Sequence, residues 1–221
     1  MNIAIIPARK NSQRIKNKNI KNFLGKPIIS YSIKAARDSN VFDKIVVTTD
    51  SKLIKKVSLK SGADIVINRT KKLSYNNIGI VEVVRNTIKI LEKKIGKINY
   101  VCCIFATAPL IEISKIKTAF RVIKKKKKGF VFSAKKINQD ISNIFYLEKK
   151  KIKKIINKKN KKKDLVTDAG QFYWAKKEVW MKEKTTFSKD SSYILLDKMK
   201  AQDINTIDDW KLAEIMFKLS R

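Results

Sequence analysis

Histidine is absent from this sequence of 221 residues, and several kinds of catalytic site are excluded with it. A chain without imidazole has no Ser-His-Asp or Cys-His nucleophile system, no histidine-ligated zinc and no imidazole general base. Any chemistry must therefore use carboxylates, lysine, arginine, hydroxyl groups and the backbone. With 43% hydrophobic residues the chain can still bury a sizeable core, so we expect one folded domain over residues 1–221.

Acidic residues are also few, with 19 Asp and Glu against 52 Lys and Arg, which gives a formal net charge of +33. Such a charge suits a nucleic-acid-binding protein, because cations neutralise phosphates. The two densest lysine runs, residues 124–128 and 149–163, contain no aromatic residues for base stacking and match no recognition-helix pattern. We therefore expect most lysines to lie on a solvated surface, and nucleic-acid binding remains the less favoured alternative.

Cysteine occurs twice, at the adjacent positions Cys102 and Cys103. Successive side chains of a strand point to opposite faces, so a disulfide between them is implausible and a reducing compartment fits best. The apolar start of the chain is too short for a membrane span and has no basic stretch before it, as a secretory signal would. These features predict a cytoplasmic protein that does not enter the membrane.

Short apolar runs alternate with amphipathic segments along most of the chain. The runs predict strands, and the segments between them, with apolar residues at helical spacing, predict helices. Such alternation predicts a mainly parallel sheet with helices on both faces. The chain ends in a predicted helix over residues 206–219, which opens with a capping box of Thr206 and Asp209. The predicted strands are residues 3–6, 44–50, 64–67, 100–105, 130–134 and 169–174.

One segment, residues 137–165, differs from the rest because apolar residues alternate there with Asn and Lys. We interpret this segment as a strand-rich excursion that protrudes from the domain. One compact α/β domain has little room to bury its apolar residues, so we expect them to form the contact of a homodimer. These residues are Ile141, Ile144, Tyr146, Ile152 and Ile155.

The loop after the first predicted strand carries the most informative group of polar residues. Ligands of an open parallel sheet bind beyond the carboxyl ends of its strands. The cations of this loop and its backbone amides can surround a polyphosphate, although a solvated basic loop is an equally good interpretation from composition alone. P-loop and dinucleotide-binding glycine patterns are absent. The polar residues of the loop are Arg9, Asn11, Ser12, Arg14, Lys16 and Lys18.

The scarce carboxylates give candidates for a metal site. Asp50 follows a predicted strand, and Asp203 lies just before the final helix. Either could hold Mg²⁺ beside phosphates, because hard cations prefer oxygen ligands. Asp203 is equally well explained as a turn residue. Asp208 and Asp209 more simply complement the positive end of the helix.

Several separated blocks of the sequence, in the same order, resemble the CMP-sugar synthetases, the cytidylyltransferases that activate sialic-type nine-carbon acids. The resemblance covers nearly the whole chain and is weakest over residues 137–163. The downstream blocks are most similar to those members that use pseudaminic acid. The blocks are IAIIPARKNSQRIKNKNI, FLGKPIISYSIKAA, FDKIVVTTD and DINT, followed downstream by YVCCIFATAPL, DAGQFYWAKKEVW and AQDINTIDDWKLAE.

The resemblance implies a Rossmann-like nucleotidyltransferase fold, a mainly parallel mixed sheet with a small protruding dimerisation excursion. It also implies that CMP passes from CTP to a sugar acid with release of pyrophosphate, assisted by Mg²⁺. In this chain Arg9, Lys18 and Asp203 are the implied catalytic residues, and Asp203 with Asn205 would hold the metal. The implied substrate-binding residues are Ser12, Arg14, Asn19, Asp50, Phe105, Thr107, Gln171 and Lys161, the last reaching the sugar of the neighbouring subunit.

Some positions depart from the pattern of these synthetases. Asn205 stands where they have a second aspartate, so weaker metal binding follows, and Ile80 stands where they carry a hydroxyl group near the nucleotide. A same-fold protein impaired at these two positions is therefore an open alternative. Phe105 lies where sialic acid synthetases have glutamine, and an aromatic side chain favours a less hydroxylated sugar. We expect pseudaminic acid, with N-acylneuraminic or legionaminic acid as alternatives.

Overall fold

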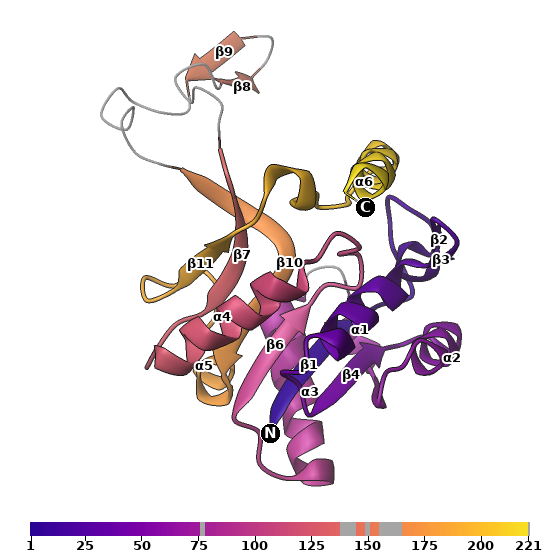
Figure 1. Cartoon of the computed structure of the whole chain (residues 1–221), viewed down its shortest axis with the longest axis vertical. Helices are drawn as coiled ribbons and strands as arrows, with labels where there is room; N and C mark the ends of the chain where they lie inside the picture. Colours follow the sequence, from indigo (N-terminus) through magenta and orange to yellow (C-terminus); the bar gives the residue numbers. More distant parts are fainter. Residues whose placement is uncertain (76–77, 138–144, 149–150, 155–164, 221) are drawn as a thin grey trace.

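The computed structural model describes residues 1–75, 78–137, 145–148, 151–154 and 165–220. Seven strands in these ranges form one sheet, with the spatial order β11-β7-β10-β6-β1-β4-β5 (Figure 1). The predicted strands are all present, with ends that move by a few residues. The seven strands are β1 (Asn2–Pro7), β4 (Lys44–Thr49), β5 (Ile65–Asn68), β6 (Tyr100–Ile104), β7 (Val131–Lys136), β10 (Val166–Lys176) and β11 (Ser192–Leu195).

The sheet is mixed, and most of its neighbouring strands are parallel. Strand β1 runs parallel to both β4 and β6, β4 runs parallel to β5, and β7 runs parallel to β11. Only β10 runs antiparallel to its neighbours β6 and β7 within the described sheet. The predicted mainly parallel mixed sheet is confirmed.

Helices cover both faces of the sheet, as predicted. Helices α1 (Ile28–Asp38), α2 (Lys52–Lys60) and α4 (Ile113–Lys125) contribute to one apolar cluster, and α3 (Ile80–Ile95) and α5 (Lys177–Lys182) contribute to another. Alternate strand residues divide between the two layers. Ile6 and Cys102 belong to the first cluster, whereas Ile5 and Cys103 belong to the second. The two cysteines are therefore buried on opposite faces as free thiols.

Helix α6 (Ile207–Leu219) closes the chain over a third, smaller apolar cluster. Its predicted capping box is confirmed, because the Thr206 Oγ1 accepts a hydrogen bond from the Asp209 amide and the Asp209 carboxylate accepts one from the Thr206 amide. Trp210 packs edge-on against Phe23 of the short β2 strand (Asn22–Phe23), which pairs with β3 (Lys26–Pro27). This packing holds the start of α6 beside the loop that follows β1.

The excursion contains an antiparallel two-stranded ribbon of β8 (Phe145–Glu148) and β9 (Lys151–Lys154). The ribbon is separate from the seven-stranded sheet and stands beyond its end in Figure 1. The predicted strand-rich character is confirmed only for the described residues 145–148 and 151–154 of this segment. Ile141, Ile144, Ile155 and Lys161 lie outside the described residues. No helix in the described ranges is both long and apolar enough to cross a membrane.

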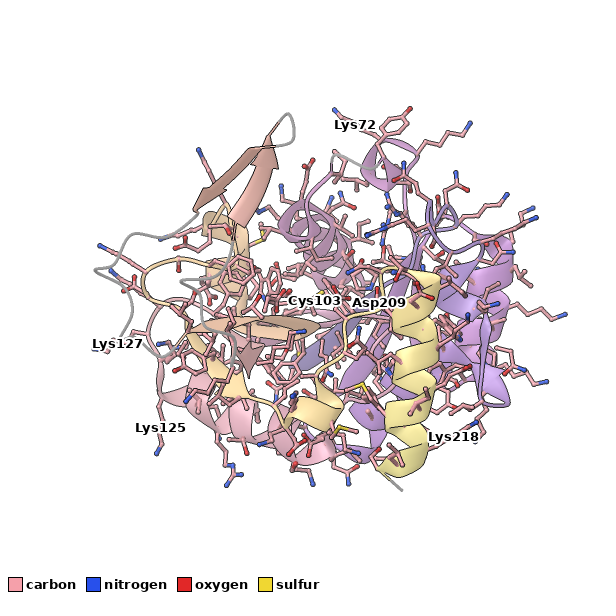
Figure 2. The ribbon with its side chains drawn as sticks, turned by 90° about the horizontal axis from the view of Figure 1, so that it is seen from above. Lys72, Cys103, Lys125, Lys127, Asp209 and Lys218 are labelled. Atoms are coloured by element: carbon pink, nitrogen blue, oxygen red, sulfur yellow. The ribbon has the colours of Figure 1, made fainter. Side chains whose placement is uncertain are left out.

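The lysines that determine the charge lie mainly at the periphery. Figure 2 shows Lys72, Lys125, Lys127 and Lys218 pointing away from the body of the protein, and all four are exposed. Their exposure agrees with the expected solvated surface. Few of the lysines are therefore available to a ligand site in the interior of the fold.

Candidate active site

A cavity of about 330 Å³ lies beyond the carboxyl ends of β1, β5 and β6. The loop after β1, the residue after β5, the start of α3 and the residues after β6 form its walls, and Asn205 completes it from the segment before α6. This is the edge at which the sequence predicted a ligand site. Eight predicted site residues line the cavity, namely Arg9, Ser12, Arg14, Lys18, Asn19, Phe105, Thr107 and Asn205.

The loop after β1 is held in place by its own polar side chains. The Asn19 side-chain amide, which is buried, donates a hydrogen bond of 2.9 Å to the backbone oxygen of Arg9. Asn17 adopts a left-handed conformation with φ of 52°, which asparagine tolerates better than most residues, and bends the chain into a 3-10 turn over Lys18–Ile20. Asn19 thus positions the loop that carries Arg9 and Lys18.

Lys18 connects this loop to the segment that precedes α6. Its Nζ donates a hydrogen bond of 2.6 Å to the backbone oxygen of Ile204. Burial lowers the pKa of Lys18, the Asp203 carboxylate opposes that effect, and Arg14 and Arg9 add to it. Arg9, Arg14 and Lys18 all line this cavity, an arrangement that an anionic ligand would stabilise.

Arg69, directly after β5, is a cavity residue that the sequence analysis missed. Its side chain is buried and donates from Nη2 to the backbone oxygen of Thr48 at 3.1 Å, while its Nε has no hydrogen-bond partner in the structure described. Burial lowers the pKa of Arg69, and the nearby Asp50 counteracts this. Because Arg69 lines the cavity, its guanidinium is a candidate ligand contact, although the unpaired Nε atom itself is buried.

Asp50 is not among the residues that line this cavity, and its role as a substrate contact or metal ligand stays a prediction. Its Oδ1 accepts a hydrogen bond of 2.7 Å from the Lys10 amide, and it supports Arg69 electrostatically. Asp50 also does not cap α2, because the Ser51 Oγ accepts the bond from the Ile54 amide. Asp50 therefore stabilises the loop after β1 and the charged form of Arg69.

Asp203 and Asn205 lie next to each other, as their spacing predicted. The Asn205 Nδ2 donates to the Asp203 Oδ2 at 2.6 Å, and the Asn205 Oδ1 accepts from the Arg14 Nη2 at 2.8 Å. The Asp203 Oδ1 has no such partner among the described residues, and that part of the chain contains no group of three acidic or cysteine side chains suited to a metal. A metal would thus depend on Asp203.

The space around Asp203 depends on Gly170. A Cβ atom at residue 170 would lie 3.0 Å from the Asp203 Cγ, and Gly170 has a φ of 62° that disfavours other residues. The absence of a side chain therefore leaves room for the Asp203 carboxylate. An oxygen ligand of this kind, unpaired at Oδ1, fits a Mg²⁺ ion.

Asp168 and Tyr173 of β10 form a second polar pair close to Asp203 that the sequence did not reveal. The Tyr173 hydroxyl donates to the Asp168 Oδ2, and the Gly170 amide donates to its Oδ1 at 3.0 Å. Burial raises the pKa of both side chains, and the negative charge of Asp203 raises them further. This pair places a neutral tyrosine and a shielded carboxylate near Asp203, although neither residue is among those that line the cavity.

Aromatic side chains form a surface beside the cavity. The ring of Phe105, which lines the cavity, lies 5.5 Å from that of Tyr173, and the Phe187 ring lies 6.2 Å from Tyr173 and 5.2 Å from Phe132. Phe187 is 55% exposed although it contacts this group. We refer to Phe105, Phe132, Tyr173 and Phe187 as the aromatic surface.

Gln171 is not among the residues that line this cavity, and its role as a substrate contact stays a prediction. It is buried, and its Nε2 donates to the backbone oxygen of Lys200. Its role in the structure is to hold the segment that leads to Asp203. Ile80 does line the cavity near the nucleotide position that the resemblance implied, among the apolar residues Leu73, Tyr75, Ile78 and Val83. Lys161 lies outside the described residues.

Known proteins resemble this chain over nearly its whole length. The family model described as cytidylyltransferase matches residues 3–193. The chain is 37% identical to a pseudaminic acid cytidylyltransferase of Campylobacter jejuni, covering 99% of this chain and 97% of the relative. It is 26% identical to the CMP-N,N'-diacetyllegionaminic acid synthase of Legionella pneumophila, with 99% and 97% covered. A solved CMP:2-keto-3-deoxy-manno-octonic acid synthetase complexed with CTP has a similar fold, with a TM-score of 0.74 at 11% identity and coverage of 100% and 99%.

Proposed function

The chain belongs to the cytidylyltransferase family, and we propose that it transfers CMP from CTP to pseudaminic acid and releases pyrophosphate. The observation that carries this proposal is the cavity itself, where Arg9, Arg14, Lys18 and Arg69 converge beyond the ends of parallel strands. A triphosphate is the ligand that best matches such a group of cations. The membership confirms the family resemblance seen in the sequence.

The reaction joins an oxygen of the sugar to the α-phosphorus of CTP. The anomeric hydroxyl oxygen attacks the α-phosphorus, the bond to the oxygen bridging the α- and β-phosphates breaks, and its electron pair leaves with pyrophosphate as the hydroxyl proton is released. Negative charge grows on the departing oxygens, so fixed cations accelerate the step. Arg9 and Lys18, which line the cavity, provide that charge in this chain.

Arg69 and the apolar residues around Ile80 suit the cytosine base. The ring would pack against the apolar wall, and the Arg69 guanidinium, which lines the cavity, can donate to an acceptor on its edge. Cytosine offers acceptors at O2 and N3, whereas uracil carries a hydrogen on N3. A guanidinium that donates to N3 therefore favours CTP over UTP.

The aromatic surface supports a deoxy sugar acid as the second substrate. Phe105 and Phe187 offer apolar contacts, which suit a sugar with few hydroxyl groups better than a heavily hydroxylated one. Pseudaminic acid is therefore proposed as the preferred substrate. Legionaminic acid and N-acylneuraminic acid are the alternatives, and nucleic-acid binding is a distant one.

Magnesium is the proposed cofactor, with Asp203 as its ligand from this chain. Bound Mg²⁺ would neutralise the triphosphate and favour departure of pyrophosphate. The unpaired Asp203 Oδ1 and the space over Gly170 support this assignment. Cytoplasmic supplies of CTP and Mg²⁺ also make the cytoplasm the proposed place of action.

A homodimer built through the excursion is the proposed assembly. An isolated two-stranded ribbon such as β8–β9 is at best marginally stable in water, so it gains stability by packing against another surface. Light scattering at micromolar concentration tests this, and a monomer there would contradict it. In the dimer, Lys161 is proposed to reach the sugar bound to the neighbouring subunit.

The proposed function is tested by pyrophosphate release with CTP and Mg²⁺ in the presence of pseudaminic, legionaminic or N-acetylneuraminic acid. We expect the highest kcat/KM with pseudaminic acid and little release with UTP. Calorimetric titration with CTP and with duplex DNA separates the enzyme from a nucleic-acid-binding protein. The proposal fails if no sugar acid stimulates release, or if DNA binds and CTP does not.

A further inference from the structure

We propose that Asn205 acts as a clamp for Arg14 and not as a metal ligand, so that the Arg14 guanidinium is a fixed cation for the CTP phosphates. The inference rests on the proposed function and deepens it. The Asn205 amide connects a guanidinium on one side with a carboxylate on the other, through hydrogen bonds of 2.8 Å to Arg14 and 2.6 Å to Asp203. Both polar atoms of this amide are thereby engaged.

The two neighbours of Asn205 determine which way its amide faces. Arg14 offers only donors and an ionised Asp203 offers only acceptors. If the amide were turned over, its NH₂ group would meet the guanidinium and its oxygen would meet the carboxylate, and both contacts would be repulsive. The oxygen of Asn205 must therefore face Arg14 for as long as both charged side chains remain in place.

A metal ion on the Asn205 oxygen would lie directly against the Arg14 guanidinium. Two cations at such close range repel each other strongly in a partly enclosed site. The amide oxygen contributes only a dipole in return, because asparagine carries no charge. The ion is consequently left to Asp203 and the phosphates, while Asn205 serves Arg14.

Arg14 is well placed for that task, because it lines the same cavity as Arg9 and Lys18. One Nη2 donor of its guanidinium is used by Asn205, and a guanidinium has five donors in total, so others remain for phosphate oxygens. A long, exposed arginine loses side-chain entropy when a ligand fixes it. Clamping by Asn205 in advance reduces that loss and strengthens the contact with phosphate.

The experiment compares wild type, Asn205→Ala, Arg14→Gln and the double variant in two binding assays. CTP is titrated calorimetrically in the presence of EDTA, and Mn²⁺ is titrated into the CTP complex without sugar acid and followed by electron paramagnetic resonance. Each single variant should weaken metal-free CTP binding by about tenfold or more, the size expected for a charge-assisted hydrogen bond. The double variant should bind CTP no more weakly than Arg14→Gln, and Asn205→Ala should hold Mn²⁺ within about twofold of wild type.

The matched control is Asn22→Ala, the same change at an exposed residue of β2 that does not line the cavity. It should leave the dissociation constants for metal-free CTP and for Mn²⁺ unchanged, and circular dichroism should show that all variants remain folded. The inference is overturned if Asn205→Ala weakens Mn²⁺ binding fivefold or more, if it leaves metal-free CTP binding unchanged, or if the two penalties multiply in the double variant. Wild type that neither binds CTP nor releases pyrophosphate would instead refute the proposed function.

Discussion

The Lys18 ammonium donates a 2.6 Å hydrogen bond to the backbone oxygen of Ile204, a residue 186 positions further along the chain. This bond and the contact of Arg14 with Asn205 join the first loop of the sheet to the segment before the last helix. The proposed phosphate-binding cations and the proposed metal ligand thus belong to one connected unit. A substitution in the loop after β1 should therefore alter the position of the segment before α6, and the reverse should also hold.

Removing the cations of the first loop should slow turnover. We expect Arg9→Ala and Lys18→Ala each to lower kcat/KM by about tenfold or more, because a charge that contacts phosphate in the transition state is lost. The measurement is pyrophosphate release under subsaturating CTP. Lys127→Ala, at an exposed residue far from the cavity lining, is the control and should remain close to wild type. Equal losses at all three positions would point to a general effect of charge.

Base selection should depend on Arg69. Arg69→Gln keeps a polar side chain but removes the charge, and we expect the preference for CTP over UTP to fall by about tenfold, the value of one charge-assisted hydrogen bond. The ratio of kcat/KM for the two nucleotides is the measurement. Arg121→Gln, a matched change on the exposed face of α4, should leave this ratio unchanged. If Arg69→Gln also leaves it unchanged, the base is recognised elsewhere.

The space over Gly170 should control metal use. Gly170→Ala forces a Cβ to within 3.0 Å of Asp203, so we expect a higher Mg²⁺ concentration at half-maximal rate. Gly62→Ala is the control, because its φ of 98° also disfavours a side chain although the nearest atom that a Cβ would meet, on Ile33, lies 3.9 Å away. Both variants should lose about 1 to 2 kcal/mol of stability, the usual cost of a left-handed residue with a side chain. If the Mg²⁺ concentration at half-maximal rate rises equally in both variants, the effect comes from backbone strain and not from contact with Asp203.

The capping box should make stability depend on pH. The partial burial of Asp209 raises its pKa, but hydrogen bonds from Thr206 and from the backbone amide of Asn205 outweigh this effect and lower the pKa. A lowered pKa in the folded state means that the stabilisation is fully present above the ordinary value of 3.8 and is lost as the pH falls through the lowered value. The difference in Tm between wild type and Asp209→Ala should therefore be largest above about pH 5 and shrink towards pH 3. A difference that is constant with pH would contradict this.

The sequence predicted the first half of the fold well because local patterns suffice there. Buried parallel strands are rich in β-branched residues, as in β4, and the intervening helices carry apolar residues at regular spacing. The capping box of α6 is equally local. The antiparallel direction of β10 has no such signal, since it depends on how the chain returns after the excursion. The short elements β2, β3, α5 and β11 were also not predicted.

The sequence predicted those site residues that directly follow strands or match the family resemblance. It missed the residues whose role depends on burial or on neighbours that are distant in the sequence. Arg69 ends a short strand at the correct edge, but one arginine among 52 basic residues does not stand out until its burial is known. Asp168 and Tyr173 lie within a strand, and only the approach of Asp203 makes them part of the site. The register of β10 shifts between residues 168 and 173, so simple alternation along the strand does not reveal which face Gln171 occupies.

The reversed direction of β10 makes the excursion separable from the sheet. The excursion leaves from the end of β7 and returns at the start of β10, where Lys136 and Val166 are paired and the Ile137 amide donates to the Leu165 oxygen at 2.9 Å. Both ends are thus fastened to each other at one edge, as the two ends of a hairpin are. Insertions or deletions between them need not disturb any strand of the main sheet, so the excursion can vary in length and sequence independently of the catalytic domain.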